Sequence, residues 1–176
     1  MRFETTDLNG AWLIHPEQME DDRGYFVRTF CVNEFRSHGL VTEFPQHSVS
    51  YSARNGTVRG MHFQHAPHAE VKLVRCLSGS IRDVIIDIRP GSPTFRQSRS
   101  FELSADNCLQ LYIPAGFAHG FQTLHDDTRV NYLISKFHVP GAADGIRHDD
   151  PSFDVKWPLP ISKISEKDLA WPDFTA

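Results

Sequence analysis

Short apolar runs typical of β-strands recur through the middle of the chain. They are rich in Val, Ile, Phe and Tyr, and turn signals such as Ser-Gly-Ser at 78–80 and Pro-Ala-Gly at 114–116 separate them. Because no helical pattern lies between the runs, they predict an antiparallel β-sandwich or barrel. The clearest runs are 71–77, 81–89, 99–103, 108–113, 116–124 and 129–137.

The run 81–89 carries aliphatic residues at both odd and even positions. A strand covered on both faces has this pattern, so we expect it in the centre of a sheet, with Asp83 and Asp87 interrupting one face. Helical patterns are scarce: 33–38 predicts one short helix and 165–168 a capped turn. Gly and Pro are scattered rather than clustered, so we predict one domain over residues 1–176.

Composition is that of an ordinary globular protein. The 176 residues are 40% hydrophobic and 23% charged, enough to build a core. The net charge of −4, without a long run of Lys or Arg, argues against a nucleic-acid binder. No stretch has the length of a transmembrane helix and the N-terminus lacks a signal-peptide core, so we expect no membrane partner and a cytoplasmic location. Cys31, Cys76 and Cys108 form no disulfide framework, and the last two are predicted to be buried thiols within strands.

Three side chains with complementary chemistry lie close together in two β-like segments, 58–64 and 71–74. Arg59 can neutralise a phosphate, His62 can move a proton near neutral pH, and Lys72 can stabilise an oxyanion. Together they predict proton-transfer chemistry on a phosphorylated substrate. The structural alternative is that His62 is a hydrogen-bonded core residue.

A metal site is the first alternative chemistry. His62, His65, His68, Glu70 and His119 are similar to the ligand set of a metal-binding cupin. Ligands that share one face of a strand need a spacing of two, however, and position 64 is a Gln, while Pro67 interrupts the strand before His68. We therefore expect no metal. No nucleophile elbow and no nucleotide-cofactor glycine loop is present, so no cofactor is expected either.

Seven motifs are spread along the chain, at 21–26, 46–50, 58–64, 71–74, 91–95, 113–121 and 165–168. In this order they resemble the dTDP-4-dehydrorhamnose 3,5-epimerase family of rhamnose biosynthesis. The resemblance runs from about Asp7 to Phe174, and the segments around His62 and His119 are the most specific.

The resemblance implies an all-β, cupin-like β-sandwich with a jelly-roll core and a few short helices. It also implies a nucleotide diphosphate sugar as substrate, no metal, and a homodimer that exchanges an N-terminal strand. In this family the residue matching His62 is the base, Asp168 supports it and Tyr132 is the acid, while Lys72 suits an enolate oxygen. The substrate-binding residues implied are Arg23 (in the neighbouring subunit's site), Phe26, Arg28, Gln46, Ser48, Arg59, His119, His138 and Lys167.

Three of these assignments have alternatives in the sequence, and for Lys72 the alternative is a solvated strand residue. Asp83 is an alternative carboxylate partner for His62, which would leave Asp168 as part of a helix cap only. Tyr132 has the alternative of packing within its own strand.

The chain departs from the family pattern mainly around the nucleotide. Arg28 stands where Glu is usual, Ser48 where Asn is usual and His138 where Tyr is usual. Residues 53–56 hold one extra residue, and the acidic residue expected after Pro140 is replaced or displaced in 141–144. The hypothesis is that the proton transfer is kept while base or sugar specificity is shifted. Rival functions are a 3- or 5-mono-epimerase, a keto-isomerase on a differently based nucleotide sugar, a metal-dependent cupin enzyme, and a non-catalytic nucleotide-sugar binding module.

Overall fold

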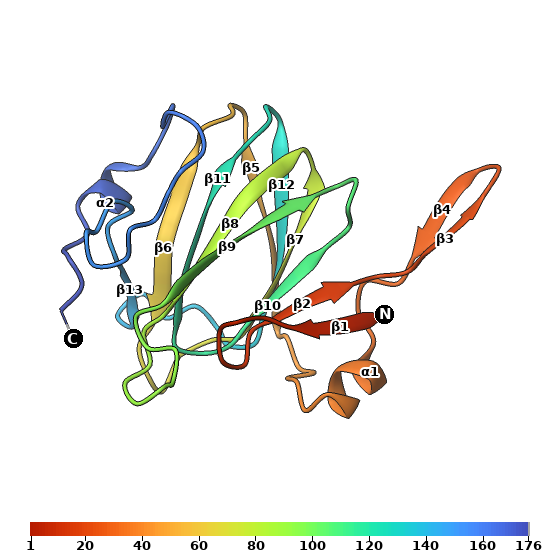
Figure 1. The fold of residues 1–176 in the computed structure, drawn as a ribbon, viewed down its shortest axis with the longest axis horizontal. Helices are drawn as coiled ribbons and strands as arrows, with labels where there is room; N and C mark the ends of the chain where they lie inside the picture. Colours follow the sequence, from red (N-terminus) through yellow and green to blue (C-terminus); the bar gives the residue numbers. More distant parts are fainter. Residues whose placement is uncertain (176) are drawn as a thin grey trace.

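The computed structural model describes residues 1–175 and places most strands in two facing antiparallel sheets (Figure 1). The six-stranded sheet has the order β1 (Arg2–Thr5), β2 (Trp12–His15), β10 (Gln110–Ile113), β7 (Lys72–Ser78), β12 (Thr128–Ile134) and β5 (Gln46–Ser52). The five-stranded sheet has the order β13 (Ala143–Gly145), β6 (Val58–Gln64), β11 (Phe117–Thr123), β8 (Ser80–Asp87) and β9 (Ser98–Ser104). The described residues also form two short helices, α1 (Val32–Ser37) and α2 (Glu166–Leu169). The predicted all-β, cupin-like sandwich with few short helices is confirmed.

Each predicted apolar run contains one strand, with ends shifted by three residues at most. The strands before residue 53 were not among the predicted runs, because most of their residues are partly or fully exposed and their alternation is weak. The prediction for Cys108 is wrong in part: the residue precedes β10, has a φ of 52° and is only half-buried. Cys76 is buried in β7 as predicted.

The main core fills the space between the two sheets. Strand β8 is buried along nearly its whole length, with Ile81 and Ile85 in the cluster between the sheets and Val84 and Ile86 in a second cluster on the other face. Burying each such side chain stabilises the fold by roughly 1.5–3 kcal/mol. The predicted coverage of this strand on both faces is therefore confirmed, although β8 lies next to the edge strand β9 rather than at the centre of its sheet.

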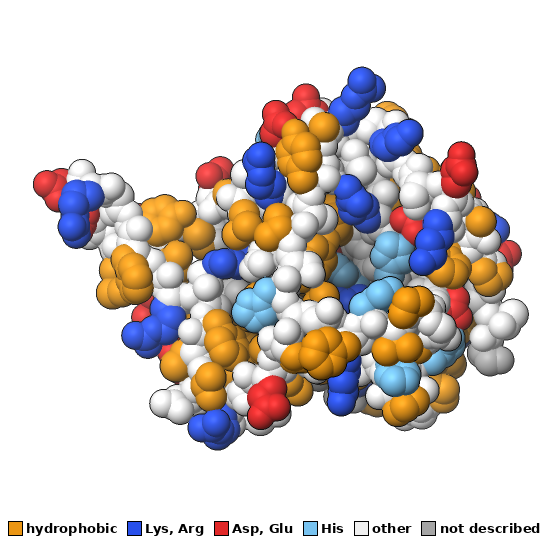
Figure 2. All heavy atoms as spheres, turned by 180° about the vertical axis from the view of Figure 1, so that it is seen from behind, with side chains coloured by type: hydrophobic (Ala, Val, Ile, Leu, Met, Phe, Trp, Pro, Cys, Tyr) orange, Lys and Arg blue, Asp and Glu red, His pale blue; other side chains and the backbone are white. Residues whose placement is uncertain are grey.

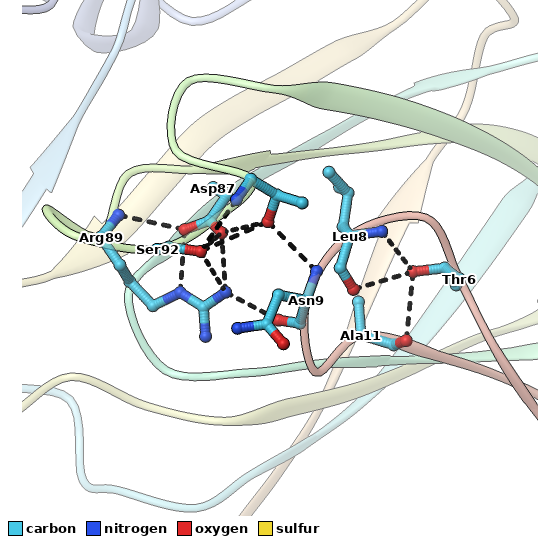
Figure 3. Close-up of polar contacts among 8 residues, drawn as sticks. Thr6, Leu8, Asn9, Ala11, Asp87, Arg89 and Ser92 are labelled. Carbon is cyan, nitrogen blue, oxygen red and sulfur yellow. Dashed lines mark hydrogen bonds and ion pairs between the residues drawn. The ribbon is translucent and has the colours of Figure 1, made fainter.

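A buried carboxylate at the end of β8 ties the N-terminal loop to the sandwich (Figure 3). Asp87 accepts hydrogen bonds from the side chains of Arg89, Ser92 and Thr94. Arg89 also donates to the carbonyl of Asn9 over 2.7 Å. Burial opposes ionisation of Asp87, but the hydrogen bonds outweigh it and lower the pKa of its carboxyl to about 2. Because the folded pKa is depressed, the network stabilises the fold by about 2 kcal/mol above pH 4, and this contribution is lost as the pH falls through about 2.

A two-stranded arm extends away from the sandwich (Figure 1). It consists of β3 (Gln18–Asp21) and β4 (Gly24–Val27), and it exposes Met19, Tyr25 and Phe26, of which Phe26 is 64% exposed. Strand β1, in contrast, pairs with β2 of its own chain. Within residues 1–175, no helix combines the length and apolar character that crossing a membrane requires.

Candidate active site

A cavity of about 610 Å³ opens between the two sheets. Strands β6 and β11 form one wall, strands β5, β7 and β12 form the other, and the segment around α2 closes one side. Figure 2 shows His and basic side chains gathered around a hollow in the molecular surface. The predicted site residues that line the cavity are Ser48, Arg59, His62, Lys72, His119, Tyr132, Lys167 and Asp168.

An irregularity in β6 brings Arg59 and His62 to the same cavity. Residues three apart on a regular strand point to opposite faces. Here the register with β11 runs from His119 opposite His62 to Phe121 opposite Arg59, so β6 has one more residue than its partner in this stretch. The two strands also approach closely at Gly60, where an added Cβ would collide with the Cα of Gly120.

His62 is paired with Asp168. Its Nε2 lies 2.6 Å from Asp168 Oδ1, and the carboxylate also accepts hydrogen bonds from the Gly60 amide and from Trp171 Nε1. Burial of Asp168 opposes its ionisation, but these hydrogen bonds outweigh it and hold the pKa of the carboxyl below its ordinary value. Because an ionised Asp168 can only accept a hydrogen bond, the proton of the neutral His62 ring lies on Nε2. Nδ1 is then the nitrogen that can act as a base. The His62 side chain is 45% exposed, whereas that of Asp168 is 6% exposed.

Asp83, the rival partner of His62, pairs with His119 instead. Asp83 Oδ1 lies 2.5 Å from His119 Nε2, and both side chains are almost completely buried. The position of Asp168 is fixed separately, because the Ser165 side chain accepts a hydrogen bond from the Asp168 amide at the start of α2. The predicted capped turn is thus present and presents its carboxylate to His62.

Tyr132 enters the cavity from the wall opposite to His62. Its hydroxyl lies 3.1 Å from Ser50 Oγ on the neighbouring strand β5. Burial raises the pKa of the Tyr132 phenol well above its ordinary value, and the hydrogen bond with Ser50 only partly offsets this. The phenol therefore stays protonated and can act as a proton donor.

Two cations complete the wall of the cavity. Lys72 Nζ lies 3.1 Å from Glu70 Oε1 and 3.4 Å from the His62 carbonyl oxygen, and the Lys72 side chain is only 12% exposed. Arg59 donates hydrogen bonds to Ser52 Oγ and to the Tyr51 carbonyl. Fixed positive charges of this kind suit a phosphate or a developing oxyanion.

A smaller cavity of about 220 Å³ adjoins the first and shares His62, Lys72 and Lys167 with it. Gln46 and His138 line it, and the His138 amide donates to Gln46 Oε1 over 2.7 Å. These two predicted binding residues therefore lie together, next to the candidate base.

Three predicted binding residues lie outside both cavities of a single chain. Arg23 and Phe26 are on the exposed arm, where the Arg23 side chain is 85% exposed. Arg28 follows the arm, and its Nη1 lies 3.7 Å from Oε1 of Glu34 on α1.

The sequence reasoning missed Ser50 and Trp171, which contact Tyr132 and Asp168. Period-two alternation from Gln46 and Ser48 was the available signal for Ser50. For Trp171 it was the position three residues after Asp168, just beyond the end of α2. Across the described residues 1–175, no three His, Cys, Asp or Glu side chains are grouped to hold a metal ion, and His65 pairs with Asp144.

Comparison with known proteins identifies close relatives over nearly the whole chain. The sequence model of the dTDP-4-dehydrorhamnose 3,5-epimerase family matches residues 5–176. The chain is 42% identical to the Sinorhizobium fredii protein of that name, over 99% of this chain and 90% of that protein. A Bacillus anthracis dTDP-4-dehydrorhamnose 3,5-epimerase structure with TDP and PPi bound is 39% identical, with a TM-score of 0.96, covering 98% of this chain and 99% of that one. The 3'-monoepimerase ChmJ from Streptomyces bikiniensis, in complex with dTDP-quinovose, is 30% identical with a TM-score of 0.89, over 97% of this chain and 86% of that one.

Proposed function

We infer that this chain, which belongs to the dTDP-4-dehydrorhamnose 3,5-epimerase family, epimerises C3 and C5 of a dTDP-linked 4-keto-6-deoxy sugar. The observation that carries the chemical proposal is that the His62–Asp168 pair and Tyr132 stand on opposite walls of one cavity, with Lys72 beside them. The residue roles that follow are our proposal.

His62 is the proposed general base. In a 4-keto sugar the carbonyl acidifies the protons on C3 and C5, and a neutral imidazole nitrogen is a suitable base near pH 7. The Asp168 carboxylate orients the ring through Nε2 and stabilises the imidazolium that forms after proton transfer. A positioned base of this kind contributes about 10²–10⁴-fold to a rate.

Lys72 and Tyr132 supply the two other parts of the reaction. Removal of the proton places negative charge on the C4 oxygen, and the ammonium of Lys72 stabilises that enolate. Because Tyr132 and His62 come from facing sheets, a sugar ring between them has one face toward each side chain. Return of a proton from the Tyr132 phenol to the face opposite His62 inverts the carbon.

The diphosphate is proposed to bind to Arg59, His119 and Lys167. All three line the same cavity, and Arg and Lys form strong charge-assisted hydrogen bonds to phosphate oxygens. The Asp83 carboxylate engages Nε2 of His119, so a doubly protonated His119 ring has its Nδ1–H left to donate to a phosphate oxygen.

Solvent deuterium exchange tests the activity, the carrier and the carbon in one assay. We expect the purified chain in D₂O to exchange C3 and C5 of the dTDP-linked 4-keto-6-deoxy sugar, because base and acid are in place on both sides of the ring. The same assay is run with CDP-, GDP- and UDP-linked sugars. A strict preference for the dTDP-linked sugar would contradict the hypothesis that Arg28, Ser48 and His138 change the specificity for the nucleotide base. Exchange at one carbon only would make the chain a mono-epimerase, and no exchange on any carrier would leave a binding module.

We also propose a homodimer, supported by the exposed arm. The two-stranded hairpin exposes Met19, Tyr25 and Phe26, and these side chains are not covered by any other part of residues 1–175. Packing of this arm, rather than of β1, on a second copy would bury these side chains and bring Arg23 toward the partner's cavity. Analytical ultracentrifugation is expected to give twice the 20.1 kDa chain mass, and a monomer at micromolar concentration would contradict the proposal.

A further inference from the structure

Glu70 is a buried carboxylate at the margin of the active site with no assigned role. It lies two residues before the start of β7 and lines the smaller cavity, and its side chain is only 7% exposed. Its Oε1 lies 3.1 Å from Lys72 Nζ. Its Oε2 is buried and has no hydrogen-bond partner among residues 1–175.

The backbone between Glu70 and Lys72 is held rigidly. Val71 packs into a core cluster, its amide donates to Ser135 Oγ over 2.8 Å, and its carbonyl accepts from the Ser135 amide over 3.0 Å. Residues two apart on an extended chain point to the same face. Glu70 and Lys72 therefore emerge side by side from a fixed anchor.

Stability alone does not account for this pair. Burying a Lys–Glu pair costs desolvation that largely cancels the attraction between the two charges, and the unpartnered buried oxygen of Glu70 adds a further cost. Apolar side chains at both positions would be as stable or more so. The pair is therefore better explained by what it does to the Lys72 ammonium, which borders both cavities.

We propose that Glu70 is a positioning residue for Lys72 in the epimerisation. The carboxylate of Glu70 and the carbonyl of His62 lie within 3.4 Å of Nζ and fix where the ammonium sits. An ammonium has three N–H donors, so this arrangement retains one for the enolate oxygen. The inference rests on the proposed function, because Lys72 needs a fixed position only if an oxyanion develops beside it.

The test is a double-mutant cycle on Glu70→Gln and Lys72→Gln with the dTDP-linked keto sugar. Glu70→Gln keeps the size of the side chain and removes its charge. We expect kcat to fall about tenfold with KM changed less than threefold, because an interaction made mainly in the transition state is weakened. In the Lys72→Gln background the same change should alter kcat less than twofold, since its effect acts through Lys72.

Glu102→Gln is the matched control, because Glu102 lies on β9 with a side chain 56% exposed and should leave kcat unchanged. A Glu70→Gln variant with wild-type kcat, or an equal loss in both backgrounds, would overturn the positioning role while wild-type activity stands. Absence of exchange by the wild-type chain itself would overturn the proposed function and this inference with it.

Discussion

Replacing His62 with Ala is expected to abolish deuterium exchange at both C3 and C5 of the keto sugar. The imidazole is the only basic side chain in the described cavity that is paired with a carboxylate while remaining half exposed to a ligand. His119 is not expected to substitute, since its side chain is almost completely buried, whereas that of His62 is half exposed. Loss of a general base costs about 10²–10⁴-fold, so we expect at least about a 10²-fold decrease in the exchange rate.

Exchange into each carbon is measured by NMR in D₂O, beside a His125→Ala control. His125 lies in the exposed turn after β11, where it contacts Ser80, away from the cavity. The His62→Ala variant should fold, because removal of a half-exposed side chain leaves only a small cavity in the protein. A His62→Ala protein that retains more than a tenth of wild-type exchange would show that another group is the base.

Replacing Tyr132 with Phe is expected to separate proton removal from inversion. The base, its carboxylate and Lys72 are untouched, so exchange should continue within about tenfold of the wild-type rate. The phenol that returns a proton to the opposite face is lost, so formation of the inverted sugar should fall by about 10²-fold, a typical contribution of a general acid. The ring itself stays, and only the hydrogen bond with Ser50 is removed.

Both quantities are measured on the same sample, with exchange followed by NMR and inversion by separating the product sugars. Tyr112→Phe is the matched control, since Tyr112 is a buried tyrosine on β10 whose hydroxyl accepts a hydrogen bond from the Val41 amide and does not line the cavity. Equal loss of exchange and inversion in Tyr132→Phe would argue against an acid acting after proton removal. Normal inversion would reassign the acid to another group.

Several features of the fold could be predicted because they depend on local chemistry. Period-two alternation and Gly–Pro turns locate a strand wherever one face is buried, so the six runs from β7 to β12 were identified with small errors at their ends. The strands of the arm and β5 were not predicted, because their residues are largely exposed and the alternation of apolar and polar residues is weak there. Gly60 was also not recognised as the site of the irregularity that aligns Arg59 with His62.

By itself, the sequence determined the strand pattern, the family motifs and the residue types available for proton transfer, because each of these is a property of neighbouring positions. Only the tertiary structure decided how these residues are paired. His62 and Asp168 are 106 positions apart, and Asp83 and His119 are 36 apart, so no local pattern distinguishes one carboxylate from the other as the partner of His62. The facing walls that set Tyr132 opposite His62 arise in the same way, from the packing of two sheets, and so does the enclosure of the Glu70–Lys72 pair at the cavity margin.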